Sequence, residues 1–404
     1  MSWSEGLSKR VVNQVLSRLE QGCLRIVEGD QVQDYGDPNA ELVGEIQVLL
    51  PQFYDSVLRG GSLGAGESWM RGEWTSPDLI AVVRVMARNL DVLTAIRSRF
   101  TWIAKPLERA RHWMRRNTAL GAKRNIEAHY DLGNDFYQLW LDPAMVYSSA
   151  IYPSPSASLE AAQQHKLEMI CQRLDLQPGQ RVMEIGTGWG ALALHMAKHH
   201  DVEVVTTTIS PAQHALASER IAAAGLSDRI TLLQEDYRDL QGQYDRVVSI
   251  EMIEAVGHAY MSTFFRKLGE LLKPDGRLLL QAITIPDQRY EGYRRSVDFI
   301  QRYIFPGGFL PSLGEMTRQL GEQTDLLLWS VDDLGQHYAR TLRDWHDNFD
   351  AAVAAVRESG YSESFIRMWK YYLGYCEGGF IERSISACHL VAVGPAWRPN
   401  SDAT

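Results

Sequence analysis

A short apolar strand that runs directly into three alternating glycines constrains this chain more than any other segment. Residues 182–190 read Val-Met-Glu-Ile-Gly-Thr-Gly-Trp-Gly, and an apolar helical pattern begins at Ala191. Glycine lets a backbone turn sharply and approach a ligand closely, and the first turn of the following helix offers unpaired N–H groups. The segment therefore predicts a parallel α/β sheet with a loop that binds a nucleotide-containing cofactor.

The residues around this loop favour a methyl donor over a nicotinamide cofactor. The spacing of Gly186, Gly188 and Ala191 also satisfies a dinucleotide fingerprint, which needs an acid about 20 residues further on for the ribose. The second expected strand ends instead in three threonines, residues 206–208. An acid, Glu184, precedes the loop, where it could face the ammonium group of S-adenosylmethionine (SAM). The sequence therefore predicts a SAM site.

Size, charge and cysteine content exclude several classes of protein. The chain has 404 residues, 45% of them apolar, which is enough for two domains that each bury a core. A net charge of −9 argues against a protein whose main partner is nucleic acid. The four cysteines lack the spacing of a metal site, and the sequence holds no uncharged apolar run near 18 residues. We therefore expect reduced thiols, no metal, no export signal and no membrane-spanning helix.

An alternation of helix and strand patterns from about Ser158 predicts the rest of the sheet. We expect strands at residues 181–185, 203–208, 230–234, 244–250, 277–283, 326–330 and 386–393. We expect a helix at residues 159–175 and a helical insertion at residues 289–320. The predicted fold class is α/β, with a Rossmann-like sheet.

The N-terminal part has the pattern of a smaller α+β domain. Its expected elements are a helix at residues 4–22, a hairpin from Leu24, an apolar run at 43–50, a glycine-rich loop with tryptophans at 58–74 and a helix from Ser76 or Asp78 to Asn89. These elements predict a separate core that precedes the parallel sheet.

A basic and aromatic segment lies between Arg97 and Arg124. It contains nine basic residues and one acid, Glu108, with tryptophans and other apolar residues between them. This composition is typical of a helix that lies on an anionic lipid surface. A solvated linker whose aromatic residues pack on a neighbouring domain is an alternative explanation, and an arm that binds nucleic acid is a third.

Polar residues follow the third and fourth expected strands, at the sheet edge where open α/β folds bind ligands. Glu251 and Glu254 come directly after the fourth strand, and Glu254 has apolar neighbours. We therefore expect Glu254 to be partly buried and to be the leading catalytic carboxylate. Asp236 and Tyr237 follow the third strand, where an acid can accept a hydrogen bond from adenine and a tyrosine can cover the ring. A loop acid that caps a turn explains this pair equally well in isolation.

A series of motifs along the chain resembles one family of lipid-modifying enzymes. The motifs are His-Tyr-Asp-x-x-Asn-Asp-Phe-Tyr, Met-x-Tyr-Ser-Ser-Ala, Glu-Ile-Gly-x-Gly-Trp-Gly, Thr-x-Ser-x-x-Gln, Glu-x-x-Gly-His, Tyr-Ile-Phe-Pro-Gly-Gly and a late Tyr-x-x-Thr-Leu. In this order they resemble cyclopropane-fatty-acyl-phospholipid synthases and their mycolic-acid relatives. Residues 58–67 are similar to the N-terminal domain of bacterial and plant members, so the resemblance covers most of the chain.

The resemblance implies transfer of the SAM methyl to the cis double bond of an unsaturated acyl chain in a membrane phospholipid. A proton then leaves the added methyl group and a cyclopropane ring closes. In this family the base looks like a bound bicarbonate, whose cage would fall on Glu254, the Tyr338 hydroxyl, the backbone at Ile283, Ser149 and Gln281.

The chain departs from many bacterial members at two cage positions. Those members have cysteine where this chain has Ser149 and histidine where it has Gln281. Both substitutes can still donate hydrogen bonds to an anion. The departures leave one alternative to ring formation, a C-methyltransferase that forms a methyl or methylene branch. A lipid-binding homologue without catalysis is a second alternative, against which the presence of Glu254, Tyr338 and a complete glycine loop argues.

The resemblance also implies a set of cofactor contacts. Together with the glycine loop they are Tyr147, Ser148, Glu184, Gly186, Gly188, Gly190, Thr208, Gln213, Asp236 and Tyr237. The Thr208 and Gln213 pair takes the place of the missing ribose acid. Two aromatic segments, Tyr303–Pro311 and Tyr371–Phe380, are suited to line an apolar tunnel for the acyl chain, or they belong to the core.

The expected partners are a phospholipid with an unsaturated acyl chain, an anionic membrane surface and a second copy of the chain, but no nucleic acid. The expected location is the cytoplasm, peripheral on the inner membrane face. The predicted domains are a lipid-associated domain at 1–95, a basic linker at 96–125, a catalytic domain with an acyl-binding insertion at 126–397 and a tail at 398–404.

Overall fold

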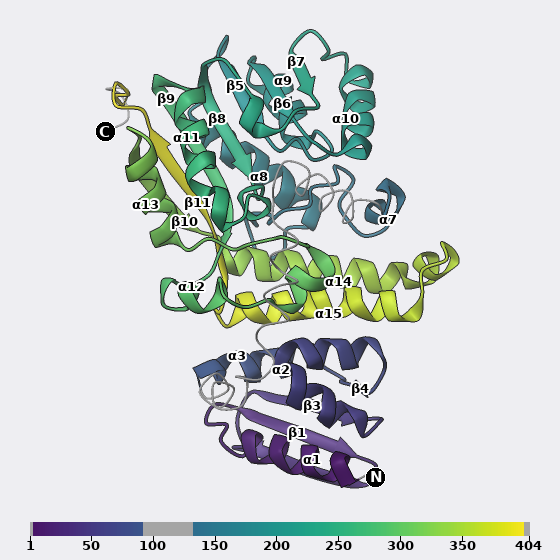
Figure 1. The fold of residues 1–404 in the computed structure, drawn as a ribbon. Helices are drawn as coiled ribbons and strands as arrows, with labels where there is room; N and C mark the ends of the chain where they lie inside the picture. The colour runs from purple at the N-terminus through teal and green to yellow at the C-terminus, as the bar shows by residue number, and fades with distance from the viewer. Residues whose placement is uncertain (1–2, 92–131, 400–404) are drawn as a thin grey trace. The chain divides into compact units, whose positions relative to one another are not determined.

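The computed structural model describes residues 3–91 and 132–399, which form two compact units (Figure 1). Neither unit is continuous in sequence. The described residues of the first unit are 3–91, 296–304 and 342–384, and those of the second are 132–295, 305–341 and 385–399. This division differs from the expected one, in which residues 126–397 form a single domain. The basic segment at 96–125 lies outside the described residues.

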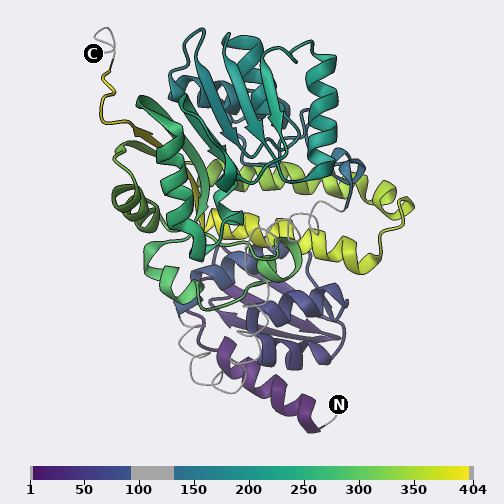
Figure 2. The same cartoon turned by 45° about the horizontal axis from the view of Figure 1, so that its top comes forward.

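The second unit contains a seven-stranded sheet, and Figure 2 shows its twisted strands from a second direction. The strands are β5 (Arg181–Ile185), β6 (Glu203–Thr207), β7 (Ile230–Leu233), β8 (Tyr244–Ile250), β9 (Leu272–Thr284), β10 (Leu327–Asp333) and β11 (Ser386–Val393). Their order is β10-β11-β9-β8-β5-β6-β7, and β10 and β11 are antiparallel to their neighbours. All seven predicted strands are confirmed.

The strand order changes direction at β5, which pairs with β6 on one side and with β8 on the other. From β5 the chain adds β6 and β7 on one side, and it then returns to add β8 and β9 on the other. Open α/β sheets bind ligands at such a switch point, beyond the carboxyl ends of the strands. The topology therefore places the predicted site at the ends of β5 and β8.

Helices cover both faces of this sheet. The described helices of the second unit include α7 (Asn134–Gln138), α8 (Leu159–Leu174), α9 (Ala191–His199), α10 (Pro211–Ala223), α11 (Met261–Leu271), α12 (Asp287–Tyr293) and α13 (Leu313–Gln323), with short 3-10 turns at Tyr237–Asp239, Ile253–Ala255 and His258–Tyr260. Val247 packs with residues of α11 and α13, whereas its neighbour Val248 packs with residues of α8 and α9. Successive strand side chains point to opposite faces, so β8 is buried on both sides.

The first unit contains a four-stranded sheet in the order β2-β1-β3-β4. Its elements are α1 (Trp3–Leu16), β1 (Cys23–Glu28), β2 (Gln31–Gly36), β3 (Val43–Val48), α2 (Gln52–Met70), β4 (Trp74–Thr75) and α3 (Leu79–Arg88), followed much later by a π-helical turn (Ile300–Ile304) and α15 (Glu363–Ile381). β1 and β2 form the predicted hairpin, and Asp78 caps α3 as predicted. The helix α14 (Gly335–Glu358) begins in the second unit, and its residues from Leu342 onward belong to the first.

The prediction of a glycine-rich loop at residues 58–74 is wrong, because most of this segment is the helix α2. Gly61 interrupts the helix with a φ of +57°. A Cβ atom on Gly66 would lie 2.5 Å from a ring carbon of Phe299, so this glycine serves close packing. The glycines of this segment suggested a flexible loop, but at Gly66 the absence of a side chain allows close contact with Phe299. The sequence analysis also did not predict the long helices α14 and α15.

Across the described residues, none of the helices combines the length and apolar character that a membrane span requires.

Candidate functional site

The three glycines of the loop between β5 and α9 all have left-handed backbone conformations. The φ angles of Gly186, Gly188 and Gly190 are +103°, +55° and +92°, a region that residues with a Cβ atom rarely adopt. A Cβ on Gly188 would meet no atom within 4 Å, so the loop is open at this position. The open backbone next to a helix N-terminus is the form expected of a cofactor loop.

Glu184 lies at the end of β5 with its side chain in the interior. It is 2% exposed, and its carboxylate accepts a hydrogen bond of 2.6 Å from the Thr206 hydroxyl. Burial raises the pKa of Glu184 to about 8. A cation beside this carboxylate would restore its ionisation, because an opposite charge favours the charged form. The site therefore fits the ammonium group of SAM.

The predicted ribose and adenine contacts follow β6 and β7. The Thr208 hydroxyl donates to Gln213 Oε1 at 2.8 Å, so the structure brings this pair together. Asp236 forms a bidentate pair with Arg238, with bonds of 2.7 and 2.6 Å. Burial opposes ionisation of Asp236, but the bonds from Arg238 outweigh it and lower the pKa. The Tyr237 hydroxyl is buried without a hydrogen-bond partner, and burial raises its pKa to about 12.

Tyr147 and Ser148 lie in the segment that precedes α8. The Tyr147 ring packs against those of Tyr137 and Trp140, with centroids 5.4 and 5.5 Å apart. The Ser148 hydroxyl accepts a hydrogen bond of 2.7 Å from the ammonium group of Lys166. Lys166 is 1% exposed, and burial lowers its pKa to about 8. The sequence analysis missed Lys166, although its helical spacing from Leu159 and Ile170 places it on the buried face of α8.

Three of the predicted cage residues gather around the carboxylate of Glu251. One carboxylate oxygen accepts from the Ser149 backbone N–H at 2.9 Å and from the Gln281 side-chain amide at 2.6 Å. The other oxygen accepts from the Tyr338 hydroxyl at 2.7 Å. Ser149 precedes α8, Gln281 lies on β9 and Tyr338 lies on α14. Sequence reasoning noticed Glu251 but gave the catalytic role to Glu254.

The backbone of Glu251 has a φ of +48°, which is unusual for a residue other than glycine. A left-handed conformation costs such a residue about 1 kcal/mol or more. The carbonyl of Gln281 accepts the backbone N–H of Glu251 at 2.8 Å and holds it in place. This conformation lies directly after the end of β8, beside the glycine loop, where backbone strain often accompanies a functional side chain.

Glu254 lies three residues after Glu251, in the 3-10 turn Ile253–Ala255. Its carboxylate accepts one hydrogen bond, from the Ile283 backbone N–H at 2.6 Å, and its second oxygen is buried without a partner. Burial, followed by the nearby charge of Glu251, raises the pKa of Glu254 to about 8. Burial also raises the pKa of Glu251, although the bonds from Ser149, Tyr338 and Gln281 oppose it. Burial therefore favours the protonated form of both carboxyls, and fewer hydrogen bonds oppose this at Glu254 than at Glu251.

A second row of side chains orients Gln281. His389 Nε2 lies 2.8 Å from Gln281 Oε1, and the Arg173 guanidinium contacts His389 Nδ1. Burial, and then the charge of Arg173, lowers the pKa of His389 far below its usual value, so the ring is neutral. Because Arg173 can only donate, His389 carries its proton on Nε2 and donates it to the Gln281 carbonyl oxygen. The amide group of Gln281 is thereby turned toward Glu251.

The bicarbonate that the resemblance implies does not fit these contacts. The Ser149 backbone N–H, the Gln281 amide and the Tyr338 hydroxyl already donate to the carboxylate of Glu251. The Ser149 hydroxyl donates to the Ala150 carbonyl at 3.0 Å. A second anion at the same donors would be buried against the carboxyls of Glu251 and Glu254, where like charges repel in a medium of low dielectric constant. We therefore derive no step through bicarbonate.

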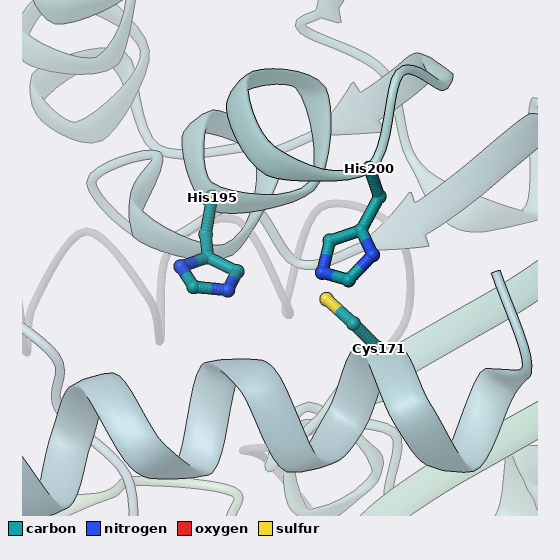
Figure 3. Close-up of side chains that lie close together, drawn as sticks. All are labelled: Cys171, His195 and His200. Atoms are coloured by element: carbon teal, nitrogen blue, oxygen red, sulfur yellow. The ribbon is translucent and has the colours of Figure 1, made fainter. Parts of the chain in front are cut away.

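Outside this site, Cys171 of α8 lies close to His195 of α9 and to His200, which follows α9 (Figure 3). One potential ligand atom from each lies within 4.8 Å of the others. Glu168 already bonds both histidine rings, with distances of 3.3 and 3.1 Å, and burial raises the pKa of Cys171 to about 12, which favours the thiol. These contacts account for the cluster as a hydrogen-bonded group, and we assign it no metal.

The two aromatic segments predicted to line an acyl tunnel lie in different surroundings. Tyr371 is buried in the first unit, where its ring packs against Phe299 with centroids 4.7 Å apart. Phe309 packs with Tyr290 in a small cluster of the second unit. Core packing, the alternative that the sequence left open, describes these side chains. Glu377, also on α15, is buried and pairs with Arg343 at 2.6 Å.

Comparisons with known proteins agree on one family. The model of the family described as mycolic acid cyclopropane synthetase matches residues 118–390. Cyclopropane-fatty-acyl-phospholipid synthase of Escherichia coli is 38% identical, over 87% of this chain and 88% of that protein. Tuberculostearic acid methyltransferase UfaA1 of Mycobacterium tuberculosis is 39% identical, over 80% of this chain and 76% of that protein. The crystal structure of mycolic acid cyclopropane synthase CmaA1 complexed with SAH and CTAB is 30% identical and has a TM-score of 0.63, over 67% of this chain and 98% of that chain.

Proposed function

Because this chain belongs to the mycolic acid cyclopropane synthetase family, we propose that it transfers a methyl group from SAM to the cis double bond of an unsaturated acyl chain in a membrane phospholipid and closes a cyclopropane ring. The chain is a SAM-dependent methyltransferase with the corresponding α/β fold. The finer proposal is supported by the Escherichia coli relative, whose name specifies a fatty-acyl phospholipid and which aligns with most of this chain.

The observation that carries the proposal is the pair of partly buried, hydrogen-bonded carboxyls directly after β8, next to the glycine loop. An alkene is a weak nucleophile and has no acidic proton that a base could remove to activate it. Methylation therefore needs the double bond to be aligned with the methyl group of SAM and water to be excluded from the site. After methyl transfer, ring closure needs a base that accepts a proton away from water. A pair of partly buried carboxyls, one of them ionised, can provide such a base.

The residues of the loop fit SAM as the methyl donor. We assign the backbone at Gly186, Gly188 and Gly190 to the methionine part, with Glu184 as the partner of its ammonium group. We assign the ribose and adenine to the remaining predicted contacts: Thr208, Gln213, Asp236 and Tyr237, with Tyr147 and Ser148 beside the donor. SAM supplies an electrophilic methyl group, whose bond to sulfur breaks with the electron pair left on sulfur.

A methylene branch is the second candidate product. The relative named tuberculostearic acid methyltransferase is as similar to this chain as the cyclopropane synthase is. A hydride shift along the acyl chain followed by loss of a methyl proton would give the branch without a reductant. The same base serves both outcomes, so the site supports either product and the assay must separate them.

We also propose that the enzyme acts on the inner membrane face through its basic segment. Residues 97–124 carry nine basic side chains and one acidic one in a chain whose net charge is −9. Such a cluster is attracted to anionic lipid, which would bring the site to its substrate. Association of two copies of the chain stays a prediction from sequence.

The test is an assay with purified protein, SAM and phospholipid vesicles that contain monounsaturated acyl chains. We expect fatty acid esters heavier by one CH2 group in gas chromatography with mass spectrometry, and the fragment pattern distinguishes a ring from a branch. Vesicles of saturated phospholipid are the control. Equal incorporation of labelled methyl into saturated vesicles, or none into unsaturated ones, would refute the proposed function.

A further inference from the structure

We propose that Glu251 is the proton acceptor of the reaction, and that this enzyme carries its base as a side chain and works without an exchangeable anion. The inference rests on the proposed function and deepens it, because it concerns the step that follows methyl transfer. It is carried by the hydrogen bonds around Glu251, by its backbone and by the state of Glu254.

The hydrogen-bond donors around Glu251 form an anion-binding site, and the carboxylate of Glu251 occupies it. A backbone N–H at Ser149, a side-chain amide at Gln281 and a phenol at Tyr338 reach one carboxylate from three separate elements. Hydrogen bonds to the charged form stabilise a carboxylate, and here three of them partly offset the effect of burial, which still raises the pKa of Glu251. Gln281 is itself oriented by His389, so its donor is turned toward Glu251 before any substrate binds.

The backbone gives an independent argument. At a φ of +48° glycine would be the residue of lowest cost, yet the chain has glutamate at this position. A partly buried carboxyl on a strained backbone is doubly unfavourable for folding. Its presence at the end of β8 is explained if the carboxylate itself acts in the reaction.

The neighbouring carboxyl determines where the charge resides. Glu251 accepts three hydrogen bonds, whereas Glu254 accepts one and leaves its other oxygen buried without a partner. We therefore place a proton on Glu254 and the negative charge on Glu251. The ammonium group of Lys166, which is bonded to Ser148, also favours the charged form of Glu251. Tyr338 stays protonated and donates, because burial and then Glu251 raise its pKa far above its usual value.

The proton step balances with these groups alone. Methyl transfer uses the electron pair of the double bond to form one C–C bond and leaves the other alkene carbon electron-deficient. A C–H bond of the added methyl group then breaks. Its electron pair forms the second C–C bond of the ring, and its proton goes to an oxygen of Glu251. The proton leaves to solvent after product release, which restores the carboxylate.

Anion binding tests this inference without any lipid. Glu251→Gly removes the carboxylate and relieves the backbone strain, so the variant should fold and its donors should accept bicarbonate or formate. We expect either anion to raise the melting temperature of Glu251→Gly in a concentration-dependent manner and to leave that of the wild type unchanged, at constant ionic strength. Isosteric Glu251→Gln fills the space and should bind neither anion. Bicarbonate binding by the wild-type protein would overturn the inference.

Activity gives the second measurement. Glu251→Gln should lose roughly 10²–10⁴-fold in the rate of product formation with unchanged affinity for SAM. Glu251→Gly should show the same loss and regain activity with added bicarbonate or formate, and wild-type activity should not depend on bicarbonate. The control is Glu322→Gln, which removes an exposed carboxylate that pairs with Arg318.

The outcomes separate this inference from the proposed function. Stimulation of the wild type by bicarbonate, or activity of Glu251→Gln close to that of the wild type, would overturn the role of Glu251 while methylation itself stands. A wild-type protein that methylates no unsaturated lipid would overturn the proposed function and the proton-transfer role together. The melting experiment would then still show whether Glu251 fills an anion site.

Discussion

Replacing Glu254 with glutamine should make the stability of the protein less dependent on pH. The pKa of this carboxyl rises from 4.5 to about 8 on folding, because its carboxyl is buried beside Glu251. Between these two values the folded state keeps a proton that the unfolded state has lost, so the free energy of unfolding falls as pH rises. If Glu254 alone titrates, the loss is roughly 1 kcal/mol at pH 5 and roughly 3 kcal/mol at pH 7. Glutamine carries no charge and removes this loss.

Urea unfolding at a series of pH values between 5 and 8 measures the effect. We expect Glu254→Gln to gain stability relative to the wild type by roughly 2–3 kcal/mol between pH 5 and pH 7. Glu184, whose pKa is also raised to about 8, is present in both proteins and cancels in the difference. Glu322→Gln, an exposed carboxylate, serves as control and should show a constant difference from the wild type. A flat difference for Glu254→Gln would refute the view that Glu254 is held protonated.

Four further predictions address the cofactor loop, the surroundings of Glu251, the choice of product and the basic segment. Gly188→Ala should weaken SAM binding roughly tenfold or more in calorimetry, because alanine must adopt a φ of +55° in the open part of the loop. Gly179→Ala, with a φ of +79° and open space but outside the loop, should leave SAM affinity unchanged. Lys166→Met should shift the rising limb of the pH–rate profile to higher pH, because the positive charge of Lys166 lowers the pKa of Glu251 and its loss raises that pKa. The other titratable groups around this pair, Glu254, Tyr338 and Asp142, stay the same in the variant. An unshifted limb would exclude this coupling. Combined Ser149→Cys and Gln281→His should change the ratio of ring to branch in the lipid products, and an identical ratio would remove both positions from product control. Neutralising Arg109, Arg111, Arg115 and Arg116 together should weaken sedimentation with anionic vesicles most strongly at low salt, whereas unchanged binding would leave the segment as a linker.

The strands, the glycine loop and the helix cap of the first unit could be predicted because each depends on neighbouring residues. Apolar runs of four to eight residues predict buried strands, and three glycines between a strand and a helix indicate a ligand loop. Asp78 predicts its own cap, since its side chain bonds an N–H only three residues away. The same local logic failed for α2, where the glycines are needed for contact with Phe299, far away in the sequence.

By itself, the sequence determined the parallel sheet, the SAM loop and the presence of two acids after β8. Only the tertiary structure decided which acid is surrounded by donors. Ser149, Gln281 and Tyr338 are separated from Glu251 by 102, 30 and 87 positions, and they meet because parallel strands end at one edge while α14 returns to it. A hydrogen bond requires atoms within about 3 Å of each other, and local sequence patterns do not specify such distances between remote segments.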